Sequence, residues 1–147
     1  MKTVLFLCSG NTCRSPMAAC LFNHLCQQRG LPLRAVSAGA SASDGSPASD
    51  GAYAAMKARG LSLLGHRAQR LNEQSLEGVS LVMAMSPAHA EWCGQRFPGL
   101  SIPVRSFAPA IPDPYGGSVS LYSQTASALD AQLSQLANEL SATSPRG

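Results

Sequence analysis

The chain has 147 residues, of which 45% are hydrophobic and 13% are charged, and its formal net charge is +3. These values are typical of one soluble globular domain, which we expect to span residues 1–147 with a frayed tail over 143–147. The small net charge and the lack of a basic run argue against a nucleic-acid partner. No apolar run approaches the roughly 18 residues of a membrane span, so no membrane partner is expected.

The cysteines argue for a reduced compartment. There are five of them, an odd number, and their spacing is not typical of a disulfide framework. The apolar run at the N-terminus is too short for the core of a signal peptide. We therefore expect a cytoplasmic protein.

Strands and helices are predicted alternately along the chain. Residues 3–7 form a short apolar, partly β-branched run typical of a buried strand. A helix is predicted over 16–29, with Ser15 as its N-cap and Pro16 at its first position. Further strands are expected over 34–37, 79–85 and 104–107. Further helices are expected over 47–59, 72–77, 87–97 and 119–142, with Ser86 and Ser118 as N-caps of the last two.

This alternation predicts an α/β fold, a single three-layer domain with a parallel sheet of four strands and helices on both faces. Ligands of such folds bind outside the carboxyl ends of the strands, at a topological switch point. Residues 8–15 leave the carboxyl end of the first strand and enter the first helix. We therefore expect the functional site at this loop.

The loop from Cys8 to Ser15 has the features of an anion site with a nucleophile. Backbone N–H groups and the helix dipole favour an anion where a loop enters a helix. Gly10 permits a positive φ and Asn11 tolerates the left-handed region, while the Arg14 guanidinium can bind two oxygens of one phosphate. The same field is expected to lower the pKa of Cys8 to roughly 3.5–7.5. The loop thus suits phosphoryl transfer to sulfur.

Three other interpretations of this loop have less support. Cys8 could be an inert buried thiol, the usual fate of a free cysteine. Cys8 and Cys13 could bind a metal ion, but no second Cys/His pair with ligand spacing accompanies them. A dinucleotide-binding loop would need further glycines and a downstream acidic residue. We therefore expect no metal and no cofactor.

Asp113 is the candidate for acid–base chemistry. Phosphoryl transfer to a thiolate needs a proton donor for the leaving group, and later a base that activates water. Asp113 lies between two prolines in the segment after the last predicted strand. Because an aspartate beside proline is also common in turns, a purely structural turn is the alternative.

Together these motifs resemble the low-molecular-weight protein phosphatases, and the resemblance covers nearly the whole chain. It is carried by residues 8–16, 37–39, 66–67 and 113–115. It implies a flavodoxin-like sheet and cysteine-dependent hydrolysis of phosphorylated protein side chains through a phosphocysteine. The implied partners are a phosphorylated protein substrate and, at the loop, inorganic phosphate or other oxyanions.

The resemblance also implies roles by position. Cys8 would be the nucleophile, Arg14 would bind the phosphoryl oxygens, and Asp113 would act as acid and then as base. Ser15 would donate a hydrogen bond to the Cys8 sulfur, and Cys13 could form a reversible disulfide with Cys8. The residues implied to bind phosphate or to support the loop are Ser9, Gly10, Asn11, Thr12, Cys13, Ser15, Ser37 and His66.

Three features favour phosphoarginine over phosphotyrosine as the substrate. Thr12 stands where tyrosine-directed members typically carry a bulkier aliphatic residue. Gly116 follows Tyr115 where many of those members have a second aromatic residue, and residues 40–46 include no aromatic wall. Thr12 and Tyr115 are expected to line the substrate pocket. A protein-tyrosine phosphatase is the alternative.

Two more distant functions have weaker support. Arsenate reductases of this fold use the same loop with two further cysteines, whereas only Cys93 lies in the expected region. A phosphocysteine carrier or a phosphate-binding module would need neither Arg14 nor Asp113.

Overall fold

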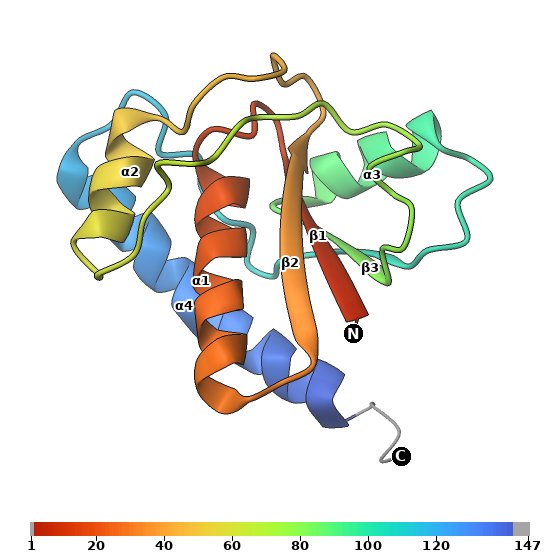
Figure 1. Ribbon diagram of the computed structural model, residues 1–147. Coiled ribbons are helices and arrows are strands. Elements are labelled where there is room, and N and C mark those ends of the chain that lie inside the picture. The colour runs from red at the N-terminus through yellow and green to blue at the C-terminus, as the bar shows by residue number, and fades with distance from the viewer. Residues whose placement is uncertain (1, 143–147) are drawn as a thin grey trace.

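A parallel sheet of four strands forms the centre of the molecule (Figure 1). The structure is a computed structural model that describes residues 2–142, so the expected frayed tail at 143–147 lies outside the described residues. The strands are β1 (Lys2–Cys8), β2 (Leu33–Gly39), β3 (Leu81–Ala84) and β4 (Val104–Ser106), in the order β2-β1-β3-β4. The predicted α/β fold is confirmed.

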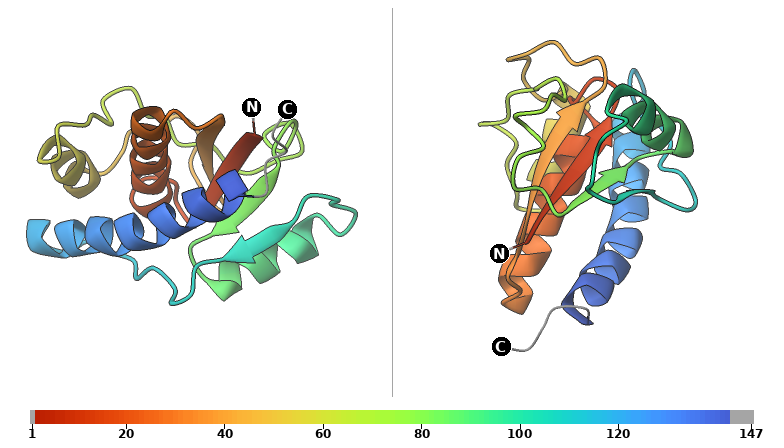
Figure 2. Two further views of the ribbon diagram at one scale, coloured as in Figure 1. Left: turned by 90° about the horizontal axis from the view of Figure 1, so that it is seen from below. Right: turned by 90° about the vertical axis from the view of Figure 1, so that its right-hand side faces the viewer.

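Helices cover both faces of the sheet (Figure 2). They are α1 (Arg14–Arg29), α2 (Asp50–Lys57), α3 (Pro87–Arg96) and α4 (Val119–Ala142). Alternate residues of β1 point to opposite faces. Val4 and Phe6 pack with α1, α2 and α4, whereas Leu5 and Leu7 pack with α3. Because β1 is buried on both faces, its sequence is a continuous apolar run rather than an alternating one.

Two predicted helix starts differ from the structure. The first helix begins at Arg14, with Cys13 in the N-cap position and without a side-chain cap, because the Ser15 hydroxyl is directed at Cys8 instead. The second begins at Asp50 rather than at residue 47, because the Ser49 hydroxyl accepts the N–H of Ala52 and caps it there. The N-caps Ser86 and Ser118 are confirmed.

The helix predicted over 72–77 is replaced by turns. Asn72 and Ser75 exchange hydrogen bonds, since the N–H of each is accepted by the side-chain oxygen of the other at 2.8 and 2.9 Å. Such local bonds compete with helical ones. The strand bounds also shift slightly: β2 is longer than predicted, while β3 and β4 are shorter.

The end of β2 lies directly against the loop that follows β1. A Cβ atom on Gly39 would lie 2.5 Å from the Ser9 carbonyl oxygen and 3.0 Å from the Asn11 nitrogen. Only a glycine permits this approach without a backbone shift. The end of β2 therefore supports the loop that leaves the neighbouring strand β1.

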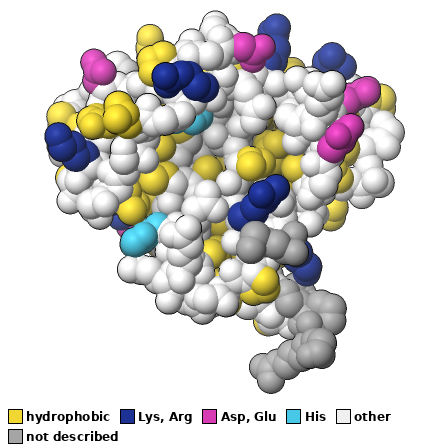
Figure 3. Space-filling model, in the orientation of Figure 1, with side chains coloured by type: hydrophobic (Ala, Val, Ile, Leu, Met, Phe, Trp, Pro, Cys, Tyr) yellow, Lys and Arg dark blue, Asp and Glu magenta, His cyan; other side chains and the backbone are white. Residues whose placement is uncertain are grey.

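Two further observations concern the surface. On the face shown in Figure 3, the Lys and Arg side chains are spread out rather than gathered in one patch. Over residues 2–142, no helix is both long enough and apolar enough to cross a bilayer.

Candidate active site

The loop between β1 and α1 surrounds a pocket at the carboxyl edge of the sheet. The pocket has a volume of about 250 Å³ and is lined by all residues from Cys8 to Arg14, together with Ser41, Asp113 and Tyr115. Residues from three separate parts of the chain thus meet at the edge that the sequence predicted.

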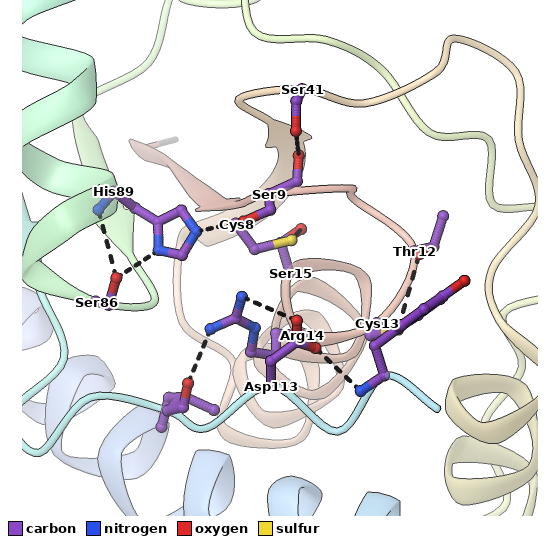
Figure 4. A network of polar contacts seen from close by, with 12 residues as sticks. Cys8, Ser9, Thr12, Cys13, Arg14, Ser15, Ser41, Ser86, His89 and Asp113 are labelled. Atoms are coloured by element: carbon purple, nitrogen blue, oxygen red, sulfur yellow. Dashed lines mark hydrogen bonds and ion pairs between the residues drawn. The ribbon is translucent and has the colours of Figure 1, made fainter. Parts of the chain in front are cut away.

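Cys8 is buried at the base of this pocket, with polar groups around its sulfur (Figure 4). Its Sγ lies 2.8 Å from the Ser15 hydroxyl oxygen and accepts the backbone N–H of Asn11 at 3.3 Å. Asn11 has φ of 56°, in the left-handed region, whereas Gly10 has no positive φ. The turn that directs N–H groups at sulfur therefore depends on Asn11 and not on Gly10.

The structure does not support a lowered pKa for Cys8. Burial raises the pKa of its thiol above the ordinary value, and this effect exceeds the lowering by the Ser15 hydroxyl, by backbone N–H groups and by Arg14. The direction of this shift is opposite to the lowering predicted from the sequence. The reason is the depth of the sulfur, which the sequence does not reveal.

Asn11 connects the loop to its surroundings. Its Nδ2 donates to the hydroxyl oxygens of Ser15 and Ser37, at 2.8 and 3.0 Å. Its carbonyl oxygen lies 2.7 Å from Nε2 of His66, and its Oδ1 accepts the N–H of Gln69. The structure thus brings together the predicted support residues Asn11, Ser37 and His66. It adds Gln69, whose backbone N–H donates to Asn11 and whose Nε2 donates to the Ser37 carbonyl oxygen.

Arg14 and Asp113 meet at the pocket although the two residues are far apart in the sequence. Nη1 of Arg14 donates to the Ile111 carbonyl oxygen at 3.0 Å, and Nη2 lies 3.7 Å from Oδ2 of Asp113. The Arg14 side chain is 8% exposed, whereas that of Asp113 is 51% exposed. A buried cation thus lies beside a carboxylate that is exposed to solvent.

The thiol of Cys13 contacts two hydroxyl groups from α4 and from the residue before α2. Its Sγ lies 3.3 Å from both the Ser49 and the Tyr122 hydroxyl oxygens. Tyr122 comes from α4 and packs so tightly against Gly51 of α2 that a Cβ atom there would overlap its ring. Cys8 and Cys13 are both free thiols, so the disulfide implied by the resemblance stays a prediction.

The remaining predicted residues lie at the rim of the pocket. Ser9 and Gly10 are exposed, and Thr12 is half-buried with Oγ1 3.7 Å from Cys13 Sγ. Tyr115 is 76% exposed. Tyr115 is thus an exposed aromatic side chain among the residues that line the pocket.

His89 is a residue near the site that sequence reasoning missed. It lies in the first turn of α3, and its ring nitrogens contact the hydroxyls of Ser9 and Ser86. The sequence could have indicated this residue, because His89 lies three residues after the predicted N-cap Ser86, at the carboxyl edge of the sheet. Among residues 2–142, no group of three or more His, Cys, Asp or Glu side chains is arranged to hold a metal ion.

Comparison with known proteins identifies the family. The family described as "Low molecular weight phosphotyrosine protein phosphatase" matches residues 3–146. This chain belongs to that family. A protein-arginine-phosphatase of Bacillus subtilis is 34% identical over 144 residues, which cover 93% of this chain and 95% of that protein.

Solved structures of this phosphatase family are similar over nearly the whole chain. A low-molecular-weight protein tyrosine phosphatase from T. tengcongensis has a TM-score of 0.90 and 34% identity, covering 95% of this chain and 99% of that chain. A mutant of YwlE arginine phosphatase with a phosphorylated active-site serine has a TM-score of 0.89 and 33% identity. The match covers 94% of this chain and 95% of that chain. The family resemblance recognised in the sequence is confirmed.

Proposed function

We propose that this chain is a protein phosphatase that transfers a phosphoryl group from a protein side chain to Cys8 and then to water. The observation that carries the proposal is the convergence on one pocket of a buried thiol, a buried guanidinium and an exposed carboxylate. The family membership and the phosphorylated active-site serine of the YwlE mutant support it.

The first step uses all three groups. The sulfur of Cys8, as a thiolate, attacks phosphorus, and the bond from phosphorus to the leaving nitrogen or oxygen breaks. Arg14 and the loop N–H groups stabilise the charge on the phosphoryl oxygens. Asp113, in its acid form, gives its proton to the leaving atom. Because burial disfavours the thiolate, its stabilisation depends on the nearby Ser15 hydroxyl and Asn11 N–H.

The second step reverses the proton flow. The Asp113 carboxylate takes a proton from water, whose oxygen attacks phosphorus while the bond to sulfur breaks. The Ser15 hydroxyl, 2.8 Å from the sulfur, is placed to donate to the departing thiolate. Inorganic phosphate leaves and Cys8 is regenerated, so the cycle consumes only substrate and water.

We infer that phosphoarginine is the preferred substrate. Thr12 offers a hydroxyl at the pocket and Tyr115 is exposed at its mouth, so the walls give little stacking surface for a phenyl ring. The relatives described as protein-arginine-phosphatases support this preference. Phosphotyrosine is the second candidate, because other relatives are described as tyrosine phosphatases. The cytoplasmic location stays a prediction.

The test compares kcat/KM for one peptide that carries either phosphoarginine or phosphotyrosine. Native protein should prefer phosphoarginine. Thr12→Val, which removes the hydroxyl at nearly constant volume, should lower kcat/KM for phosphoarginine by about tenfold. Thr12→Ile, which also adds bulk, should lower it further and shift the preference toward phosphotyrosine.

Two results would contradict these proposals. A native preference for phosphotyrosine would exclude the arginine assignment but leave a tyrosine phosphatase. Turnover by Cys8→Ser at the native rate would exclude the phosphocysteine route altogether.

A further inference from the structure

His89 fixes the residue that follows the nucleophile, although its own ring does not line the pocket. Its Nε2 lies 2.8 Å from the Ser9 hydroxyl oxygen and its Nδ1 lies 2.6 Å from the Ser86 hydroxyl oxygen (Figure 4). Ser9 lines the pocket directly after Cys8. The contact therefore joins the start of α3 to the loop across 80 residues of sequence.

The backbone of Ser9 is held from the other side. Its carbonyl oxygen accepts the N–H of Ser41 at 2.9 Å and the Ser41 hydroxyl at 3.4 Å. With both the backbone and the side-chain oxygen held, the remaining variable is the direction of the hydroxyl hydrogen. A serine hydroxyl has one hydrogen to donate and two lone pairs to accept with.

The tautomer of His89 decides where that hydrogen points. If Nε2 carries the ring hydrogen, it donates to Ser9 Oγ, and the Ser9 hydrogen is free for a group in the pocket. Ser86 then donates to Nδ1 while its oxygen accepts the backbone N–H of His89, so every group has a partner. In the other tautomer, Ser9 must donate to Nε2 and presents only lone pairs to the pocket.

Phosphoryl oxygens accept hydrogen bonds and do not donate them when ionised. An oxyanion in the pocket therefore favours the tautomer in which Ser9 donates to it. We propose that His89 is a positioning residue that directs the Ser9 hydroxyl at the bound phosphoryl group. This inference rests on the proposed function, since it requires an oxyanion at the Cys8 loop.

The charge state of His89 agrees with this role. Burial and the nearby Arg14 lower the pKa of His89 below its ordinary value, and the Asp113 carboxylate raises it to a smaller extent. These two residues are the charged groups that act on the ring, one from α1 and one from the segment after β4. The ring is thus neutral at neutral pH and holds a single hydrogen, whose position can respond to a ligand.

Nitrogen NMR of the ring tests the inference directly. The 15N shifts of His89 are recorded at a pH of about 7.5, well above the ordinary histidine pKa of roughly 6.5, during titration with inorganic phosphate. We expect the Nε2–H form to increase on binding in native protein, and this response to be absent in Ser9→Ala. His24, on the surface of α1, serves as the internal reference.

Phosphate affinity of matched variants gives a second readout. Ser9→Ala and His89→Leu should each weaken phosphate binding about tenfold, and the double variant no more than either one, because both remove the same donor. His89→Gln, whose amide can still donate to Ser9, should retain most of the affinity. His24→Gln should bind like the native protein.

The outcomes separate this inference from the proposed function. If phosphate shifts the loop resonances but leaves the His89 nitrogens unchanged, or if the losses of Ser9→Ala and His89→Leu add, the positioning role is wrong and the phosphatase proposal stands. If phosphate shifts no loop resonance, the positioning role is overturned, whereas the proposed function is decided by turnover of the phosphopeptides. Ser9→Ala removes only an exposed hydroxyl and should fold, so the comparison does not depend on His89→Leu.

Discussion

At the residue scale, Asn11 combines a left-handed backbone with hydrogen bonds from both ends of its side-chain amide. A buried amide of this kind is costly to lose, because Ser15, Ser37 and Gln69 would each lose a partner. The same residue donates its backbone N–H to Cys8. One side chain therefore determines both the shape of the loop and the surroundings of the nucleophile.

Substitutions at Asn11 can separate the contribution of its left-handed backbone from that of its side-chain hydrogen bonds. Asn11→Ala should lower the free energy of unfolding by about 2–4 kcal/mol. It removes the hydrogen bonds of the side-chain amide, and alanine tolerates the left-handed region less well than asparagine. Asn11→Gly should be about 1 kcal/mol less harmful, because glycine adopts that region freely. Urea unfolding measures both values. Equal losses would show that the backbone conformation contributes little.

Asp113 gives a prediction about leaving groups. Asp113→Asn removes the proton donor, so it should slow turnover of aryl phosphates with poor leaving groups by about a hundredfold or more, and that of good leaving groups much less. Asp130→Asn, which affects a carboxylate paired with Arg59 outside the pocket, is the control. Uniform slowing across the series of leaving groups would argue against the acid role.

At the element scale, the junction of β2 with the loop allows a sharp test. Gly39→Ala would place a methyl group against the Ser9 carbonyl oxygen and the Asn11 nitrogen, neither of which can rotate away. We expect a loss of about 1–3 kcal/mol in stability and a drop of at least about tenfold in kcat/KM, because the loop must shift. Unfolding curves and initial rates measure the two effects.

Gly94→Ala is the matched control, since Gly94 lies in α3 with open space around it. It should raise stability by up to about 1 kcal/mol through helix propensity. If both alanine variants retained native activity, the close approach of β2 would not be needed to hold the loop.

The helices show where sequence patterns are reliable. Ser86 and Ser118 were predicted as N-caps because a serine before a helical segment usually serves its own backbone, and the structure confirms both. Ser15 has the same local pattern, yet its hydroxyl contacts Cys8. The difference is tertiary, because the Ser15 hydroxyl is bonded to the nucleophile and α1 begins without a side-chain cap.

At the scale of the whole molecule, the strand order explains why the site could be located from the sequence. In a parallel sheet all carboxyl ends lie at one edge. The segments after β1, β3 and β4 therefore bring together the Cys8 loop, Ser86 with His89, and Asp113. The meeting of Arg14 and Asp113 followed from this rule together with their chemistry.

The features of the site that could not be predicted depend on how deeply a side chain is buried and on contacts of backbone groups. The burial that raises the pKa of Cys8 and the contact of Gln69 with Asn11 arise only once the layers have packed. His89 was missed because an isolated histidine on a helix is usually an ordinary surface residue. Its position became informative only through Ser9, 80 residues earlier.

The contact of Arg14 with the Ile111 carbonyl has a consequence for how activity returns when the chain refolds. The two residues are 97 positions apart, and their contact joins the start of α1 to the segment that follows β4. Closing so long a loop costs conformational entropy, so the contact is favourable only together with other native contacts. During refolding, a chain with a completed first strand and helix would still lack the second wall of its pocket. Enzymatic activity should therefore return only with the last native structure, and it would report complete folding rather than the presence of the loop alone.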